Sequence, residues 1–162
     1  MFIKQADLFW GLGKSFLKEV VDIAHKETLK KNEFLFHEDD PADSFFMLLK
    51  GRVRLTINAT GQIDFNLSNA GDTFGWSSLT GNNKYTASAE CTEPVTLLRF
   101  NGNNLQKIIN DYPADGLIFY KRLAGMIGNR LIQSYRMNSD ISPQGKAISF
   151  GTGQVIASES VL

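Results

Sequence analysis

A series of short apolar or alternating runs between Thr28 and Thr96, each ended by a turn signal, constrains this chain most. The breaks between them are rich in Gly, Asn, Asp and Pro, the residues that end strands and form turns. Many short strands at close spacing indicate an antiparallel sandwich or barrel. The runs that predict strands are Leu29, Phe34–Phe36, Phe45–Leu49, Val53–Ile57, Ile63–Leu67 and Val95–Phe100.

Helical patterns flank this β-region on both sides. An apolar cluster at Leu8–Leu12 precedes Ser15–His25, whose apolar residues recur at helical spacing and predict an amphipathic helix with His25 near its end. After the strands, Asn103–Asn110 predicts a short helix, and Ala114–Met137 predicts the longest helix of the chain. We therefore predict a mainly β fold with flanking helices.

The long helical pattern carries a seam of residues at alternating steps of three and four, which is typical of a coiled coil. Gly125 and Gly128 each cost about 1 kcal/mol of helix stability relative to Ala, so packing must compensate. Two alternatives stay open: the seam packs only on its own β-domain, or it forms a two-fold dimer. The expected interface residues are Leu117, Tyr120, Ala124, Ile127 and Leu131, with Ser134 continuing the seam.

Composition bounds the class of protein. The chain has 162 residues, enough for one domain, and a formal net charge of zero, so nothing electrostatic favours nucleic acid or an anionic membrane as partner. The single cysteine, Cys91, excludes an internal disulfide framework, and we expect it to be a small buried residue on a strand. Because no apolar run approaches the roughly 20 residues that span a bilayer, we expect a cytoplasmic protein.

The stretch Gly71–Ala89 carries the strongest functional pattern. It opens with a turn, continues into a short helix-compatible run at Trp76–Leu79, breaks at Gly81–Asn83 and resumes as a strand-like Tyr85–Ser88. A glycine lets the backbone approach a ligand, and the first turn of a helix offers N–H groups to an anion. The residues expected to contribute are Phe74, Gly75, Trp76, Ser77, Ser78, Leu79, Lys84, Tyr85 and Thr86.

This stretch resembles the phosphate-binding cassette of cyclic nucleotide-binding domains, usually written F-G-E-L-A-L followed by P-R-A-[AST]. Phe74, Gly75, Leu79 and Ala87 match that pattern. Trp76 stands where the family has the glutamate that holds the ribose hydroxyl. Tyr85 stands where the family has the arginine that pairs with the cyclic phosphate. The resemblance implies a jelly-roll domain, similar to the cupin double-stranded β-helix, and the substitutions imply that cyclic AMP binds poorly or not at all.

A second stretch, Phe34 to Leu55, is similar to the family pattern I-x-x-x-G-D-x-x-x-x-Y-x-I-x-x-G-x-V, with Asp39 in place of the first glycine and Gly51 at the second. The resemblance extends over roughly Leu8–Met137 and is closest to the sensor domain of bacterial catabolite-activator regulators. In that type the long helix also gives a polar pair to the bound base, for which Ser134 and Tyr135 are the nearest counterparts. We expect a sensor domain at residues 1–138, and a tail or an added strand at 139–162.

Other kinds of chemistry have weaker patterns. The acidic residues Glu38, Asp39, Asp40 and Asp43 lack the ligand spacing of a calcium loop, so we expect a solvated turn and no metal. Cupin enzymes need clustered histidines, and no H-x-H, H-x-x-x-H or G-x-S-x-G motif is present. Some gas sensors of the wider group ligate haem through a histidine, which leaves His25 or His37 as an alternative.

We therefore predict a non-catalytic regulatory domain that binds a small effector, needs no cofactor, forms a homodimer and acts on an unknown output protein. The space after the long helix is too short for a winged helix-turn-helix, so we expect no direct binding of nucleic acid. Trp76 and Tyr85 are expected to make the walls of the site apolar above a floor of helix N–H groups that still accepts an anion. This favours an effector that is less charged than a cyclic nucleotide and has a flat or apolar portion beside a carboxylate, phosphate or similar acceptor. The alternatives are a degenerate scaffold, in which Trp76 fills the pocket and nothing binds, and a haem-based sensor.

Overall fold

A computed structural model describes residue 3, residues 6–58 and residues 63–141 of the chain. It divides into two compact units, Met1–Arg122 and Leu123–Leu162. The first unit holds every strand of the described residues, and helix α3 begins in it. The predicted tail or added strand at 139–162 lies outside the described residues from residue 142 onward, and α3 continues to Ile141.

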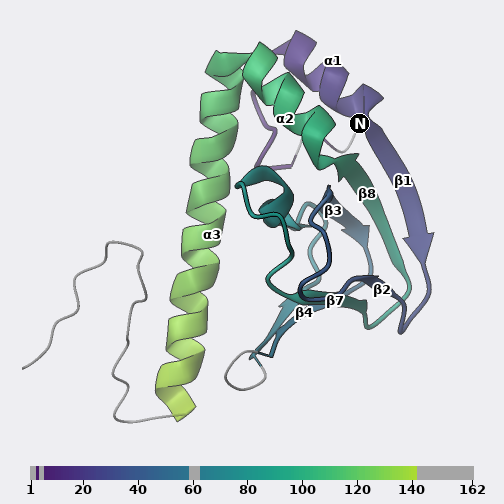
Figure 1. Cartoon of the computed structure of the whole chain (residues 1–162), viewed down its shortest axis with the longest axis vertical. Helices are drawn as coiled ribbons and strands as arrows, with labels where there is room; N and C mark the ends of the chain where they lie inside the picture. Colours follow the sequence, from purple (N-terminus) through teal and green to yellow (C-terminus); the bar gives the residue numbers. More distant parts are fainter. Residues whose placement is uncertain (1–2, 4–5, 59–62, 142–162) are drawn as a thin grey trace, which may run out of the picture. The chain divides into compact units, whose positions relative to one another are not determined.

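Two antiparallel four-stranded sheets form the first unit (Figure 1). One has the strand order β1-β8-β3-β6, and the other has the order β2-β7-β4-β5. The mainly antiparallel β fold with flanking helices is thereby confirmed. The strands are β1 (Ala24–Leu29), β2 (Phe34–Phe36), β3 (Ser44–Lys50), β4 (Val53–Ile57), β5 (Ile63–Leu67), β6 (Thr73–Phe74), β7 (Ser88–Cys91) and β8 (Val95–Asn101).

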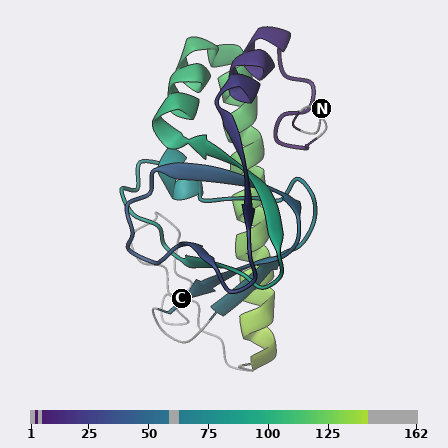
Figure 2. The same cartoon turned by 90° about the vertical axis from the view of Figure 1, so that its right-hand side faces the viewer.

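Three helices and one short 3₁₀-helix complete the described elements. They are α1 (Lys14–Asp22), η2 (Trp76–Leu79), α2 (Gly102–Asp111) and α3 (Pro113–Ile141). Two views place α1 and α2 together at one end of the strands (Figures 1 and 2). The Asn101 side chain caps α2 by accepting a hydrogen bond from the Asn104 N–H. No helix among the described residues is long and apolar enough to cross a membrane.

The prediction that His25 lies near the end of the first helix is wrong. Helix α1 ends at Asp22, and His25 lies on strand β1 opposite Arg99 of β8. The apolar spacing of the helix continues by coincidence through Ala24, but backbone pairing with β8 along the whole of β1 decides the conformation of these residues. Sequence reasoning also missed the two-residue strand β6.

The core between the sheets is unusually rich in aromatic rings. Phe46 stacks on Phe74 with ring centroids 5.0 Å apart, and Phe36 stacks on Phe46 at 5.7 Å. Cys91 is fully buried on β7 in the same cluster, as predicted. These rings fill the interior around Phe74 of the predicted cassette, so they limit the space available there for a ligand.

Candidate functional site

The second residue of the cassette pattern is a glycine that the backbone requires. Gly75 has a φ of +79° and precedes the 3₁₀-helix η2, which has the predicted bounds. A Cβ at this position would lie 2.8 Å from the Ser44 carbonyl oxygen and 2.9 Å from the Phe46 ring. Glycine therefore serves both the left-handed conformation and the close approach of strand β3.

Polar groups of η2 are largely used inside the protein. Ser77 is buried, and the Ser78 hydroxyl donates to the Gly75 carbonyl oxygen at 2.8 Å. The Leu79 carbonyl oxygen accepts hydrogen bonds from Gln106 of α2 and from the Tyr120 hydroxyl of α3, both at 3.3 Å. Trp76 is half-buried. The short helix is thus held in place by its neighbours.

Tyr85, the residue in the place of the family arginine, points into the core. Its side chain is 4% exposed, and its ring stacks on Phe36 with centroids 3.7 Å apart and planes 15° from parallel. The hydroxyl donates to the Ser44 carbonyl oxygen at 2.8 Å and accepts from the Ser44 N–H at 3.0 Å. Burial raises the pKa of this phenol above its ordinary value. The ring therefore fills the interior instead of forming an exposed wall.

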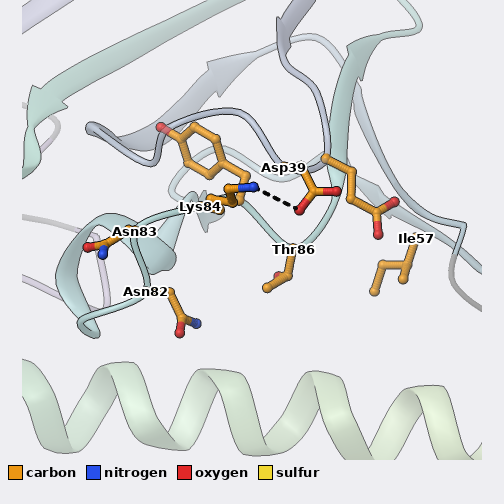
Figure 3. Close-up of a pocket in the computed structure, with 8 residues that line it drawn as sticks. Asp39, Ile57, Asn82, Asn83, Lys84 and Thr86 are labelled. Carbon is orange, nitrogen blue, oxygen red and sulfur yellow. Dashed lines mark ion pairs between the residues drawn. The ribbon is translucent and has the colours of Figure 1, made fainter.

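An open hollow of about 620 Å³ lies beside this segment (Figure 3). Lys84 and Thr86, the neighbours of Tyr85, turn their side chains toward it. The two loops that form it are joined by backbone hydrogen bonds, from the Asp39 N–H to the Tyr85 carbonyl and from the Tyr85 N–H to the Asp40 carbonyl. The lining residues are Glu38, Asp39, Ile57, Asn82, Asn83, Lys84, Tyr85 and Thr86.

Asp39 shows why the family pattern has a glycine at this point. Its φ is +71°, in the left-handed region that glycine adopts freely and that aspartate tolerates better than most residues. The conformation of the turn is thus retained although the glycine is absent. Retaining it brings a carboxylate to the rim of the hollow.

The charges of the hollow are two carboxylates and one ammonium. Lys84 Nζ lies 3.9 Å from an oxygen of Asp39, and the two side chains are 67% and 81% exposed. The Glu38 carboxylate accepts the Asn58 N–H at 3.2 Å, and no ion pair involves Glu38 among the residues that the structure describes. The site thus has a formal charge of minus one.

The structure brings only part of the predicted site together. Lys84, Tyr85 and Thr86 border the hollow, whereas Phe74 and residues 75–79 are absent from its lining. Sequence reasoning missed Glu38, Asp39, Ile57, Asn82 and Asn83 as lining residues. A usable signal was present, because the acidic turn and the Asn-Asn pair each stand beside a predicted strand, but nothing in the spacing showed that the two loops pair with each other.

Residues Ser134 and Tyr135 lie on α3 in the second unit, so their contact with a ligand stays a prediction. The Ser134 hydroxyl donates to the Leu131 carbonyl oxygen within the helix. Tyr120, Ile127 and Ser134 of the predicted seam are half-buried, whereas Ala124 is exposed. Leu117 and Leu131, also from that seam, are 58% and 42% exposed.

Neither histidine is among the residues that line the hollow. His25 is exposed on β1, and His37 stacks on Phe34 with centroids 4.5 Å apart, next to Asp40. Within the described residues, no group of three or more His, Cys, Asp or Glu side chains is arranged to hold a metal ion. The haem alternative therefore rests on single histidines.

Comparison with known proteins identifies related sequences. The profile of the cyclic nucleotide-binding domain family matches residues 26–112, more than half of the chain. Isozyme 1 of the cGMP-dependent protein kinase of Drosophila melanogaster is 24% identical over 115 residues, which are 68% of this chain and 15% of the kinase. The chain thus spans a small part of that curated relative.

Solved structures share the fold. A candidate cyclic nucleotide-binding protein from Geobacter metallireducens has a TM-score of 0.71 and 27% identity, covering 79% of this chain and 94% of that one. The sensor domain of the transcriptional regulator DNR from Pseudomonas aeruginosa has a TM-score of 0.66 and 22% identity, covering 81% and 94%. The catabolite activator protein of Thermus thermophilus has a TM-score of 0.63 and 22% identity, covering 83% and 62%.

Proposed function

The chain belongs to the family of cyclic nucleotide-binding domains, and from that membership we propose that it is a non-catalytic regulatory domain whose effector is not a cyclic nucleotide. The sensor domain in this proposal comprises residues 1–138 and passes its signal to another protein. Relatives of this chain include both regulators and a kinase, so the absence of catalysis is part of the proposal.

The observation that carries the proposal is the placement of Tyr85. A hydrogen bond to a charged group contributes about 1.5–3 kcal/mol, so loss of the family arginine alone weakens binding of a cyclic phosphate roughly ten- to hundred-fold. Tyr85 offers no replacement, because both hydrogen bonds of its hydroxyl are made to Ser44. Trp76 likewise cannot accept a hydrogen bond from the ribose hydroxyl as a carboxylate does, because its indole N–H only donates.

The charge of the hollow supports the same conclusion. Lys84 is the cation among its lining residues, and Asp39 already pairs with it. A phosphate entering the hollow meets the carboxylate of Glu38, which is not the partner of Lys84. The Lys84 side chain, which could attract the phosphate, is mostly exposed to water. The electrostatic balance therefore opposes an anionic ligand instead of attracting one.

Calorimetry with cyclic AMP and cyclic GMP tests this proposal. We expect no saturable heat with either nucleotide below about 100 µM. A low-micromolar dissociation constant for either nucleotide would contradict the proposal.

A second function, an interaction scaffold that binds no small molecule, is favoured by the stacked rings of Phe36 and Tyr85 in the interior. Fluorescence distinguishes the two. Trp10 is exposed, so Trp10→Phe is a mild change that leaves Trp76 as the reporter. A change in emission or melting temperature during a metabolite screen supports the effector module. No change, together with cyclic nucleotide binding by the variant Trp76→Glu/Tyr85→Arg, supports the scaffold.

We also propose that the domain is a homodimer through α3. Exposed apolar or small residues recur along this helix at steps of seven, and a Cβ added at Gly125 or Gly128 would meet nothing within 4 Å. Such a stripe lets two helices approach closely. It contains three residues of the predicted seam, Leu117, Ala124 and Leu131, and a second row of Ile118, Gly125 and Ile132. Exposed Tyr135 lies about one turn beyond Leu131.

Light scattering tests the dimer. Leu131→Lys places like charges near a two-fold axis and should give a monomer at tens of micromolar. Gln133→Lys adds the same charge to an exposed position off the stripe and should leave the mass unchanged. A monomeric wild-type protein would remove this part of the proposal. An absorption spectrum of the same sample tests the haem alternative, because bound haem absorbs strongly near the violet end of the visible spectrum.

A further inference from the structure

The hollow beside residues 82–86 has the size of a small-molecule site and a net charge that favours one class of ligand. Its volume of about 620 Å³ lies within the range of small-molecule pockets. We propose that it binds a small organic cation with a neutral, hydroxylated body, such as an amino sugar. This inference deepens the proposed function, because it names the effector class of a domain that does not use cyclic nucleotides.

The carboxylates supply the cation-binding end. Glu38 is half-buried, its N–H donates to the Ser88 hydroxyl at 2.9 Å, and its carboxylate accepts the Asn58 N–H. These bonds fix the backbone and one carboxylate oxygen without neutralising the charge. Since Lys84 already faces Asp39, one ammonium added by a ligand brings the hollow to neutrality. Hydrogen bonds between an ammonium and a carboxylate are among the stronger ones available to a ligand.

The neutral body of the ligand is matched by the rest of the lining. In Figure 3 the side chains of Asn82 and Asn83 lie on the side opposite Ile57, with that of Thr86 between them, and Glu38 is a further lining residue. Amide side chains both donate and accept, and a hydroxyl does the same, so they suit sugar hydroxyls better than a second charge. Ile57, 39% exposed, offers an apolar surface for the carbon face of a ring.

The hollow is formed before a ligand arrives, because backbone hydrogen bonds join its two loops. In addition to the bonds of Tyr85 with Asp39 and Asp40, the Ala42 N–H donates to the Asn83 carbonyl at 3.0 Å. Pro41 and Lys84 form an isolated antiparallel β-bridge. Tyr85 anchors one loop in the core through its ring. A preformed site avoids part of the entropy cost of binding.

The experiment uses three sugars that differ mainly in charge. Glucosamine carries the ammonium, N-acetylglucosamine keeps the ring without the charge, and glucuronate carries an anion. Each is titrated into the whole ¹⁵N-labelled chain, with amide shifts recorded for residues 38–40, 42, 57 and 82–86. We expect saturable shifts with glucosamine, at least about tenfold weaker binding of N-acetylglucosamine and no binding of glucuronate.

Two variants test the role of Glu38. Glu38→Gln keeps the shape and should weaken glucosamine binding about tenfold or more. Glu93→Gln removes an exposed carboxylate that pairs with Arg52 outside the hollow, and it should leave the affinity unchanged. The inference is overturned if glucosamine does not bind, if the N-acetyl sugar binds as well, or if both variants behave alike. Its failure would leave the proposed function intact, since that fails only if cyclic AMP or cyclic GMP binds tightly.

Discussion

Neighbouring residues of one loop lie in opposite environments. Tyr85 points into a dry interior, stacks on Phe36 and has both of its hydrogen bonds satisfied by Ser44. Lys84 and Thr86 border a hollow that is open to water and carries carboxylates. Consecutive residues of this segment thus face opposite sides: Tyr85 faces the aromatic core, and Lys84 and Thr86 face a charged surface.

This contrast explains how the family cassette changed its character in this chain. Where the family pattern has an arginine, Tyr85 packs on Phe36, so the interior has a stacked ring in place of a cation. The charged side chains of Glu38, Asp39 and Lys84 line the open hollow instead. Stability and binding are therefore expected to respond to different residues of the loop.

The largest expected effect is that of Tyr85→Ala. Removal of a buried aromatic side chain costs about 3–5 kcal/mol of unfolding free energy, because a cavity replaces the stacked ring. Urea denaturation followed by circular dichroism measures the change. A loss below about 1 kcal/mol would mean that the ring is not part of the core.

The milder change Tyr85→Phe separates the ring from its hydroxyl. The ring still stacks on Phe36, but the N–H and carbonyl of Ser44 lose their partner. An unpaired buried polar group costs about 1–3 kcal/mol, so this variant should fall between wild type and Tyr85→Ala. Equal stability of both variants would assign the whole effect to the hydrogen bonds.

After Tyr85→Ala, the next largest effect is that of Gly75→Ala, for which Gly81→Ala is a matched control. Both glycines have positive φ, but only the Cβ at position 75 meets the Ser44 carbonyl and the Phe46 ring. Left-handed strain costs about 1–2 kcal/mol in each variant, and overlap adds about 1–3 kcal/mol at Gly75 alone. Thermal unfolding should rank the wild type above Gly81→Ala, and that variant above Gly75→Ala. Equal losses would show that the core side of the loop is not tightly packed.

Local patterns in the sequence predicted most of the fold. Strands β4 and β5 have the predicted bounds because Val53–Ile57 and Ile63–Leu67 are bounded by unambiguous turn residues. The short strand β6, Thr73–Phe74, could not be predicted, because two residues carry no periodicity and its conformation depends on pairing with β3. The misplaced His25 has the same cause, since pairing with β8 overrides a helical spacing.

The site was less accessible to sequence reasoning than the fold. The bounds of η2 followed from Gly75 and Gly81, which punctuate the chain on either side. The direction of the Tyr85 side chain did not, because it depends on Phe36, a residue almost fifty positions earlier whose distance no local pattern encodes. The pairing of the acidic turn with residues 82–86 is likewise a tertiary contact.

Another prediction concerns the exclusion of water from the interior. Burial raises the pKa of the Cys91 thiol from an ordinary value of 9.0 to about 11. The unfolded chain therefore loses this proton at a lower pH than the folded chain does, so the contribution is intact below pH 9 and is lost as the pH rises to about 11. Unfolding free energy measured from pH 8 to 11 should fall less steeply for Cys91→Ala than for wild type. Parallel curves would indicate that water reaches the thiol.

The smallest expected effect is that of Lys84→Met on the open side of the loop. Exposed ion pairs contribute about 0–1 kcal/mol, and the 3.9 Å separation from Asp39 places this pair at the weak end. Methionine keeps the apolar stem, so we expect a change of less than about 0.5 kcal/mol in urea denaturation. A double-mutant cycle with Asp39→Asn, which tolerates positive φ, isolates the pair and should give a coupling of the same small size. A loss as large as that of Tyr85→Phe would break the contrast between the two sides, because it would mean that the hollow contributes to the folding stability of the loop as much as the core does.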